Sequence, residues 1–516
     1  MRRLSAIFIL IASPACSSAR PPDPSALLRS ARAQERLADA DRLVRAGCYD
    51  CLVSAYRAFE QLETTPAAAD AARAGAARAA GLLAIREREL GMADTGFLSL
   101  ARERSLQESS DRAAWLPRVL DVARVMTGAV YGVSRPPLTD DELRQSIEIR
   151  RGREALAAML RAQAPTDELA AYAWAIFTCR SVEARDVTPD EIFSITPLAD
   201  SPLLRFSRAT CRGLDQPALE RLLQEDARFG EVPFLLGLLA LGRRDLDGAQ
   251  ALFERAYAWH PRWPSLTQSM GSLAMTGEDF ESAARFYAEA LEVEPRSVDA
   301  QLGMVRALTY LGRHEAAIQA TDALLALRWY PGDARYWRAL NEAQLERYDA
   351  AWADVEEAAK LQINAEVPKL AGIIAYRRQQ LDVATAKFEE SLTRNHDDCE
   401  TGFYLGVVRA ELRNWPQTAE VLVAAAACLE NAEETLDAEI EAIRSSQDSP
   451  DRQARQIARR ERDIANGRRM IATSWFDTAV AYFSLTRKDE ARRFAEKVAD
   501  DEQYADRARE LLSRIK

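Results

Sequence analysis

The residues of this chain that could do chemistry by type and spacing are its seven cysteines. Two of them form a C-x-x-C motif, Cys48-Tyr49-Asp50-Cys51. Such a motif can be a local disulfide, a pair of free thiols, a redox couple or half of a zinc site. No alternating β–α pattern surrounds it, as a thioredoxin-like couple requires. Leu52 rather than histidine follows it, which excludes haem attachment, and no second pair lies near it to complete a zinc site. We favour a local disulfide and keep the other interpretations as alternatives.

The remaining cysteines suggest further disulfides. If Cys16 is lipidated or removed, six cysteines are left, and an even number is typical of an oxidising compartment. Cys399 and Cys428 lie at the start of one predicted helix and the end of the next, where an antiparallel pair brings its ends together. Cys179 and Cys211 have a similar separation. Six cysteines allow 15 pairings, and the spacing favours these three without excluding others.

Other chemical motifs are missing from the sequence. There is no G-x-S-x-G, no H-E-x-x-H and no glycine-rich phosphate loop. The only histidines are His260, His314 and His396, and each lies at or near a predicted inter-helix turn. We therefore expect no catalytic residues, no metal and no cofactor, and predict that the protein is not an enzyme.

The elements that position these residues are helices. The chain has 516 residues, of which 48% are hydrophobic, and it contains only 22 glycines and 21 prolines, so long regular elements are expected. No alternating apolar pattern of useful length suggests a sheet. The net charge of −11 argues against nucleic-acid binding, which favours a basic surface.

The N-terminus is typical of an export signal. Arg2 and Arg3 precede an apolar stretch from Leu4 to Ala12, too short for a bilayer-spanning helix of roughly 20 residues. Ser13-Pro14-Ala15-Cys16 resembles a bacterial lipobox, although Ser13 stands where leucine is usual. This resemblance implies lipidation at Cys16 and an anchor in the outer membrane, facing the periplasm. Ordinary cleavage after Ala15 or Ala19, giving a soluble periplasmic protein, is the alternative, and a cytosolic protein is a further one.

A sequence repeat dominates the second half of the chain. Two copies of one pattern have the same internal spacing: Ala249, Phe253, Ala256 and Pro261 in the first, and Ala283, Tyr287, Ala290 and Pro295 in the second. A glycine precedes the first alanine of each copy at the matching position, Gly237 and Gly271. Weaker copies follow around Ala317, Ala351, Ala384, Leu405 and Ala479. The pattern resembles the tetratricopeptide repeat (TPR) family, in which small residues let two helices approach, an aromatic ring fills the gap and proline ends the unit. The resemblance implies an all-α, TPR-type α-solenoid, a superhelical stack of antiparallel helix pairs.

The sequence divides into segments on this basis. They are a signal peptide at 1–15 (or 1–19), a proline-rich tether at 16–30, degenerate helical hairpins at 31–229, a consensus-like array at 230–430, a charged helical extension at 431–470, and a last repeat with a capping helix at 471–516. The extension is acidic in its first half and basic in its second. We expect two antiparallel arms that pair with each other or, less favoured, dock a partner or lipid headgroups.

The family resemblance also implies a function. Helix A of each repeat lines a concave groove suited to an extended peptide or a helix from another protein. The family register places ten residues there: Gln268, Arg306, Tyr310, Tyr336, Gln344, Lys369, Tyr376, Arg377, Phe403 and Glu411. We therefore expect a non-catalytic interaction scaffold of the bacterial cell envelope. A cytosolic TPR regulator, or the TPR arm of an enzyme complex such as a glycosyltransferase or a peptidoglycan-enzyme regulator, is the alternative. No oligomeric state is indicated.

Overall fold

A computed structural model describes residues 24–93, 95–107, 158–179, 188–328 and 330–515. The predicted signal segment, Cys16 and the first part of the tether lie outside these residues. So do residues 108–157 and 180–187 of the segment expected to form degenerate helical hairpins. Every regular element in the described part is a helix, and no strand occurs there, which confirms the predicted all-α solenoid. None of the described helices combines the length and the apolar character needed to cross a bilayer.

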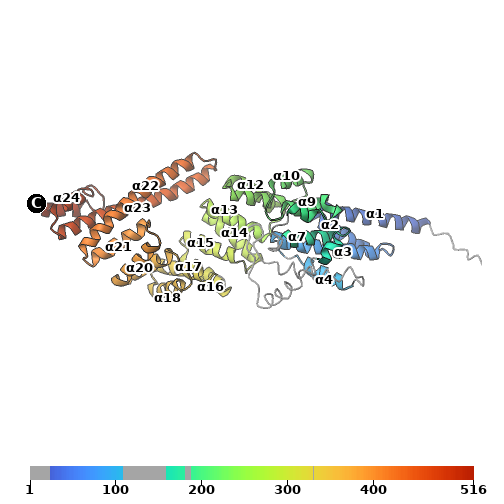
Figure 1. Cartoon of the computed structure of the whole chain (residues 1–516), viewed down its shortest axis with the longest axis horizontal. Coiled ribbons are helices and arrows are strands. Elements are labelled where there is room, and N and C mark those ends of the chain that lie inside the picture. Colours follow the sequence, from blue (N-terminus) through green and yellow to red (C-terminus); the bar gives the residue numbers. More distant parts are fainter. Residues whose placement is uncertain (1–23, 94, 108–157, 180–187, 329, 516) are drawn as a thin grey trace, which may run out of the picture.

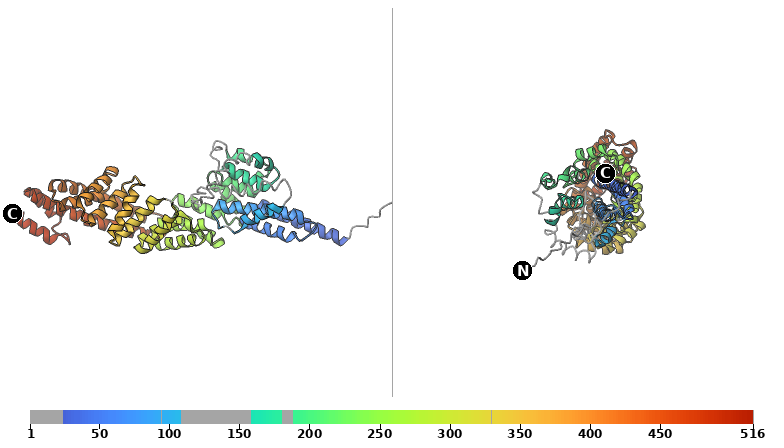
Figure 2. Two further views of the ribbon diagram at one scale, coloured as in Figure 1. Left: turned by 90° about the horizontal axis from the view of Figure 1, so that it is seen from below. Right: turned by 90° about the vertical axis from the view of Figure 1, so that its right-hand side faces the viewer.

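The N-terminal half is a bundle of helices of unequal length. Its elements are α1 (Pro24–Ala46), α2 (Tyr49–Leu62), α3 (Ala69–Leu90), α4 (Phe97–Gln107), α7 (Glu168–Cys179), α8 (Pro189–Phe193), the 3-10 helix η2 (Pro197–Asp200), α9 (Pro202–Ala209) and α10 (Gln216–Glu225). The helices α7 to α10 lie alongside α1 to α3 (Figure 2), and both groups share one hydrophobic core.

Regular hairpins follow. They pair α11 (Val232–Gly242) with α12 (Leu246–Trp259), α13 (Pro264–Thr276) with α14 (Phe280–Val293), α15 (Val298–Tyr310) with α16 (His314–Ala326), α17 (Pro331–Gln344) with α18 (Tyr348–Ala359), and α19 (Glu366–Arg377) with α20 (Leu381–Arg394). The last elements are α21 (Cys399–Glu411), α22 (Trp415–Arg444), α23 (Pro450–Ser484), α24 (Lys488–Glu496) and α25 (Ala505–Ile515).

The hairpins repeat because the same local devices recur. One residue with a left-handed backbone ends the first helix of each hairpin, at the nearly regular positions Arg244, Glu278, Gly312, Glu346, Gln379 and Arg413. Aspartates 245 and 279 then cap the second helix through their side chains. A Cβ atom added to Gly237 would lie 2.5 Å from the ring of Phe253, so only glycine allows the two helices this approach.

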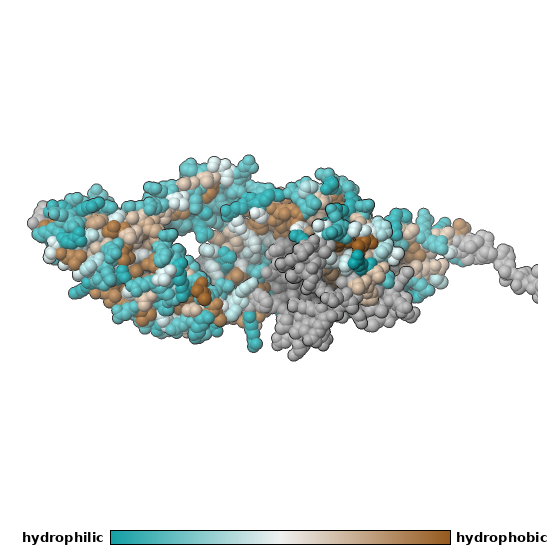
Figure 3. Space-filling view, viewed as in Figure 1, coloured by the Kyte–Doolittle hydropathy of each residue, from teal (hydrophilic) through white to brown (hydrophobic). Residues whose placement is uncertain are grey.

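Two helices are much longer than the rest. Helices α22 and α23 have 30 and 35 residues and pack against each other as an antiparallel hairpin. We call the part of this hairpin from 431 to 470 the arm. In Figure 1 the hairpins from α11 to α21 form an arc, and the arm crosses it from the C-terminal end back toward α12. The space-filling view in Figure 3 shows an opening between the arc and the arm.

Candidate functional site

The surface with the character of a binding site is the inner side of the arc, formed by the first helices of the hairpins. We call this surface the wall; it is made by α13, α15, α17, α19 and α21. It faces the arm, because α21 packs against α23 and Tyr310 of α15 lies under Arg459 of α23. Figure 3 shows an opening between the arm and the helices below it.

A ladder of aromatic rings runs along the wall, and it begins with Phe280, the first residue of the adjoining helix α14. The rings of Phe280 and Tyr310 are nearly parallel, with centroids 4.8 Å apart. Tyr310 then meets Trp337 at 6.4 Å, and Trp337 meets Tyr336 at 5.7 Å, both edge to face. Tyr310 is 42% exposed, although rings on two neighbouring elements hold it in place. Such rigid, accessible aromatic rings are typical of interface anchors.

Two arginines lie over this ladder. The guanidinium carbon of Arg306 is 6.0 Å from the centre of the Trp337 ring, and that of Arg459 is 5.2 Å from the centre of the Tyr310 ring. The first comes from the wall and the second from the arm. Cations over aromatic faces are stabilised by the ring quadrupole, and they keep their hydrogen-bond donors free at the edge of the guanidinium plane.

Farther along the wall, the predicted lysine is already paired. Lys369 Nζ lies 2.7 Å from a carboxylate oxygen of Glu400 and 3.1 Å from one of Asp398. Burial lowers the pKa of Lys369, but these two carboxylates outweigh burial and leave it above its usual value. Burial also raises the pKa of the neighbouring Tyr336 to about 12. Lys369 therefore joins adjacent repeats rather than offering an unpaired charge.

The far end of the wall is acidic. The hydroxyl of Tyr376 donates to Glu411 at 2.6 Å, and burial, followed by this bond, raises the pKa of Tyr376 to about 12. Asp477 of α23 is close enough to both residues to affect them electrostatically. Burial raises the pKa of Asp477 to about 6, with Arg507 opposing the shift and Glu411 adding to it.

The other residues predicted for the groove are placed differently from one another. Gln344 and Arg377 are exposed, and Phe403 is half-buried edge-on to Tyr404 at 5.4 Å. Gln268 is only 8% exposed, and its side-chain oxygen accepts a hydrogen bond from the hydroxyl of Ser297 at 2.9 Å. Gln268 therefore adds little to the exposed surface of the wall, because its side chain is held by Ser297, the residue that caps the first helix of the next hairpin.

The arm is fastened to the arc by arginines near its tip. Arg452 is ion-paired with Asp247 of α12 and donates to Gln250 at 2.9 Å, while Arg455 donates to the backbone oxygen of Gly277 at 3.3 Å. Arg460 is ion-paired with Glu278. We call this set of contacts the latch. Its contacts are polar, and a pocket of about 150 Å³ lies beside it, bordered by Arg452 and Arg455.

The two halves of the arm also pair with each other, as the sequence suggested. Arg468 lies 2.6 Å from Glu433, and Arg460 lies 3.2 Å from Glu439. The arm does not project freely into solvent, however, because Arg460 divides its donors between Glu439 and Glu278 of the arc. Nothing in the residue pattern of the arm indicates this second partner.

The family assignment follows from a family model. The model described as tetratricopeptide repeat matches residues 274–345, which run from the end of α13 through α17. This segment of the chain therefore carries tetratricopeptide repeats. Within this segment the wall is the helix A surface of the repeats, and TPR proteins typically bind other proteins through such surfaces.

Several solved TPR structures are similar to parts of this chain. YrrB, described as a TPR protein with an unusual peptide-binding site, is 20% identical, with 34% of this chain and 91% of that chain covered and a TM-score of 0.30. PilW, a type IV pilus biogenesis factor, is 17% identical, with 38% and 92% covered and a TM-score of 0.36. A TPR protein from Parabacteroides merdae is 15% identical, with 55% and 98% covered and a TM-score of 0.35. No curated protein matches the sequence significantly.

Six cysteines of the chain are paired in the structure. Disulfides join Cys48 to Cys51, Cys179 to Cys211, and Cys399 to Cys428. The third pair differs from the expectation in one respect, since α22 continues well beyond Cys428, to Arg444. The helix does not end at the cysteine because it goes on to form the arm.

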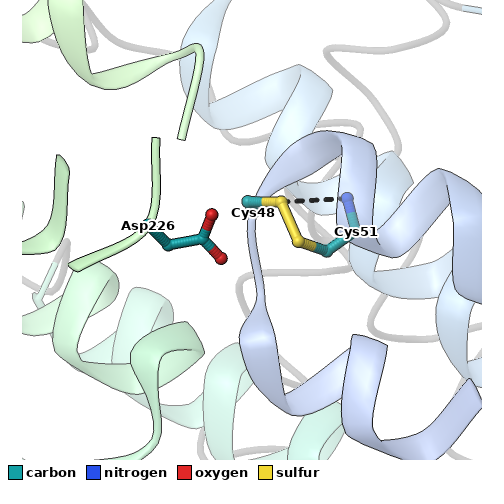
Figure 4. A group of neighbouring side chains, drawn as sticks. All are labelled: Cys48, Cys51 and Asp226. Atoms are coloured by element: carbon teal, nitrogen blue, oxygen red, sulfur yellow. Dashed lines mark hydrogen bonds between the residues drawn. A yellow bond between two sulfur atoms is a disulfide. The ribbon is translucent and has the colours of Figure 1, made fainter. Parts of the chain in front are cut away.

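Asp226 lies beside the C-x-x-C motif, with its carboxylate directed toward the disulfide (Figure 4). The two sulfurs and a carboxylate oxygen lie within 4.8 Å of one another, a group of ligand types that could hold a metal ion if the cysteines were reduced. As a disulfide the sulfurs are not thiolate ligands. Asp226 is instead paired with Arg228, which lowers the pKa of its carboxyl. We regard this group as a structural disulfide at the start of α2.

A buried polar network is the feature that sequence analysis missed in the N-terminal half. Arg86 of α3 is fully buried and ion-paired with Glu231, which is also fully buried. Its Nε donates to the hydroxyl of Tyr172 at 2.8 Å, and its guanidinium stacks on Phe206 at 3.8 Å. Tyr172 in turn donates to Glu89 at 2.5 Å. The network ties α3, α7 and α9 to the residue preceding α11.

Proposed function

We propose that this chain is an exported TPR adaptor that holds a segment of a partner protein, an extended peptide or a helix, against its wall. The observation that carries the proposal is the aromatic ladder of Phe280, Tyr310, Trp337 and Tyr336, with Arg306 exposed beside it. Aromatic and arginine side chains dominate the energetics of protein interfaces. The ladder runs through successive repeats, which suits a ligand that extends along the array.

The proposed location is the bacterial cell envelope. It is supported by the basic and apolar N-terminal segment, by the lipobox-like sequence at Cys16, and by the prolines at 21 and 22, a residue type that stiffens linkers. Three cysteine pairs in bonding geometry suit an oxidising compartment. A lipid anchor in the outer membrane would hold the TPR array in the periplasm.

Metabolic labelling with a palmitate analogue tests the anchor. The wild-type chain should be labelled and sediment with membranes, whereas Cys16→Ala should lose the label. An unlabelled wild-type chain in the periplasmic fraction would indicate ordinary cleavage, and one in the cytosol would overturn the envelope proposal.

Photo-crosslinking in cells tests the wall. A crosslinking amino acid is placed at Gln344 or Arg377, both exposed residues of the wall, or at Arg255 and Glu356, exposed residues of α12 and α18. Both wall positions should capture the same partner protein, and the two control positions should not. Equal capture from all four positions, or only crosslinks within the chain, would contradict binding at the wall.

A further inference from the structure

We propose that Arg306, Tyr310 and Trp337 of the wall and Arg459 of the arm form one composite site, which binds a carboxylate side chain of an extended partner segment. The inference rests on the proposed function, because it names the chemistry of the partner held at the same wall. It adds Arg459, which lies far beyond Tyr310 in the sequence and belongs to a different element.

The geometry brings one guanidinium group to each of two rings that contact each other. Arg459 lies 5.2 Å above the ring of Tyr310. Arg306 is one helical turn before Tyr310 on α15, and therefore on the same face, and it lies 6.0 Å from Trp337. Because Phe280 stacks on Tyr310 at 4.8 Å, the ring is fixed before any ligand arrives. Preorganised groups lose little conformational freedom on binding.

The charges at this point are available. Within the described part of the chain Arg306 makes no ion pair of 4.0 Å or less, and its side chain is exposed. The nearest carboxylate to Arg459 is that of Glu278 at 3.7 Å, and the same oxygen is already ion-paired with Arg460. In the described part of the chain, Arg459 and Arg460 are ion-paired with two carboxylates, those of Glu278 and Glu439, so the unpaired Arg306 leaves one positive charge in excess. A carboxylate is the single-charged, planar group that a guanidinium binds through two parallel hydrogen bonds.

The arm restricts the form of the ligand. At Arg459 it touches the wall, so a helix, with a diameter of about 10–12 Å, does not fit between them at this point. An extended segment can lie along the ladder and pass through the opening seen in Figure 3. Its carboxylate then reaches Arg306 and Arg459 together, and its backbone and apolar side chains contact the rings.

A peptide library tests the site. The full-length chain, immobilised after removal of its natural leader, is panned with a phage library of short random peptides. We expect enriched peptides with Asp or Glu at a preferred position. In the double variant Arg306→Gln, Arg459→Gln we expect that preference to disappear and the affinity of an enriched synthetic peptide to fall about tenfold or more, as for loss of one charge-assisted bond. The control Arg255→Gln, Arg492→Gln removes two exposed charges elsewhere and should change neither.

The outcomes separate the two proposals. Peptides enriched without acidic residues, or an acidic preference that survives in the double variant, would overturn the composite site and leave wall binding intact. If the wild-type chain enriches no peptide at all, the proposed function itself fails. Circular dichroism and the thermal midpoint of each variant establish that it is folded, which we expect because Arg306 is exposed and Arg459 is about one third exposed.

Discussion

Arg452 and Asp247 are 205 residues apart in the sequence, yet the guanidinium group of the first is ion-paired with the carboxylate of the second. The side chain of Arg452 is only 4% exposed, since it also lies against Gly277 and Gln250. The latch therefore has one buried charge at its centre and exposed or half-buried charges around it. This makes Arg452 the residue on which closure of the arm most depends.

Reversing the charge of Arg452 should open the arm. In Arg452→Glu, repulsion from Asp247 replaces attraction, and the tip should leave the arc, increasing the radius of gyration measured by small-angle X-ray scattering. Salt should act in the same direction on the wild type, because the Debye length falls from about 10 Å at 0.1 M to about 3 Å at 1 M.

Two comparisons make this prediction specific to the latch. Adding Asp247→Arg to Arg452→Glu restores opposite charges and should recover the compact form. Arg444→Glu reverses an exposed arginine of the arm whose one ion pair within the described residues is with the nearby Glu441, and it should leave the shape unchanged. If Arg452→Glu has the same radius of gyration as the wild type, the prediction is wrong. The position of the arm would then be set by apolar packing at its base and not by the latch.

Removing one member of the buried pair in the N-terminal half should be costly. Arg86→Met leaves Glu231 buried without its cation, and we expect a loss of about 3–5 kcal/mol in the free energy of unfolding. The double variant Arg86→Met, Glu231→Leu should recover part of the loss. Urea denaturation followed by circular dichroism measures both. Arg57→Met, at an exposed position of α2, is the matched control and should change the unfolding midpoint little.

The pKa of Asp477 predicts a pH dependence of stability. Because burial raises this pKa from 3.8 to about 6, the folded chain binds a proton between about pH 4 and pH 6 that the unfolded chain does not bind. The contribution of Asp477 to the free energy of unfolding therefore falls as the pH rises through this window, and the full penalty is present at pH 7. Asp477→Asn should be more stable than the wild type by about 1–3 kcal/mol at pH 7.5 and nearly equal at pH 4. A difference between the two proteins that is the same at both pH values would refute the assignment.

The two long-range cysteine pairs should stabilise the chain when oxidised. They close loops with sequence separations of 32 and 29 residues, and in the chain-entropy model each contributes about 3–4 kcal/mol. Dithiothreitol should lower the thermal midpoint, and Cys399→Ser, Cys428→Ser should reproduce part of that decrease. Peptide mapping of unreduced protein identifies the pairs directly. Free thiols at Cys399 and Cys428 in protein isolated from the periplasm would contradict the prediction.

The repeats could be predicted because each depends on residues close in sequence. Gly271 and Tyr287 lie on the two helices of one hairpin. A Cβ atom on the glycine would lie 2.8 Å from the tyrosine ring, so this one contact requires a glycine at the first position when an aromatic ring occupies the second. A constraint that recurs in each successive repeat is visible without a structure. The wall residues that follow from this register, such as Tyr310 and Tyr376, were found in the same way.

Contacts between distant segments left no such pattern. The latch joins Arg452 to Asp247 and Arg460 to Glu278 through single ion pairs, and an arginine on a charged helix looks the same whether it meets its own hairpin or an earlier repeat. The partners of Arg86 are spread over several elements without periodicity. Trp337 and Arg459 were missed for the same reason, since their roles arise only when α17 and the arm are placed beside α15.

A stack of repeats held only by neighbouring contacts behaves as a spring, which stretches easily and frays from its ends. Because α23 returns to α12, the array of repeats between these two helices is closed by a second connection. Tension at the C-terminus can then reach the middle of the chain through α23 without passing through each repeat in turn. A pull applied between the proposed membrane tether and the C-terminus would then be borne first by a few ion pairs, and the repeats that hold the partner would keep their curvature until those pairs part.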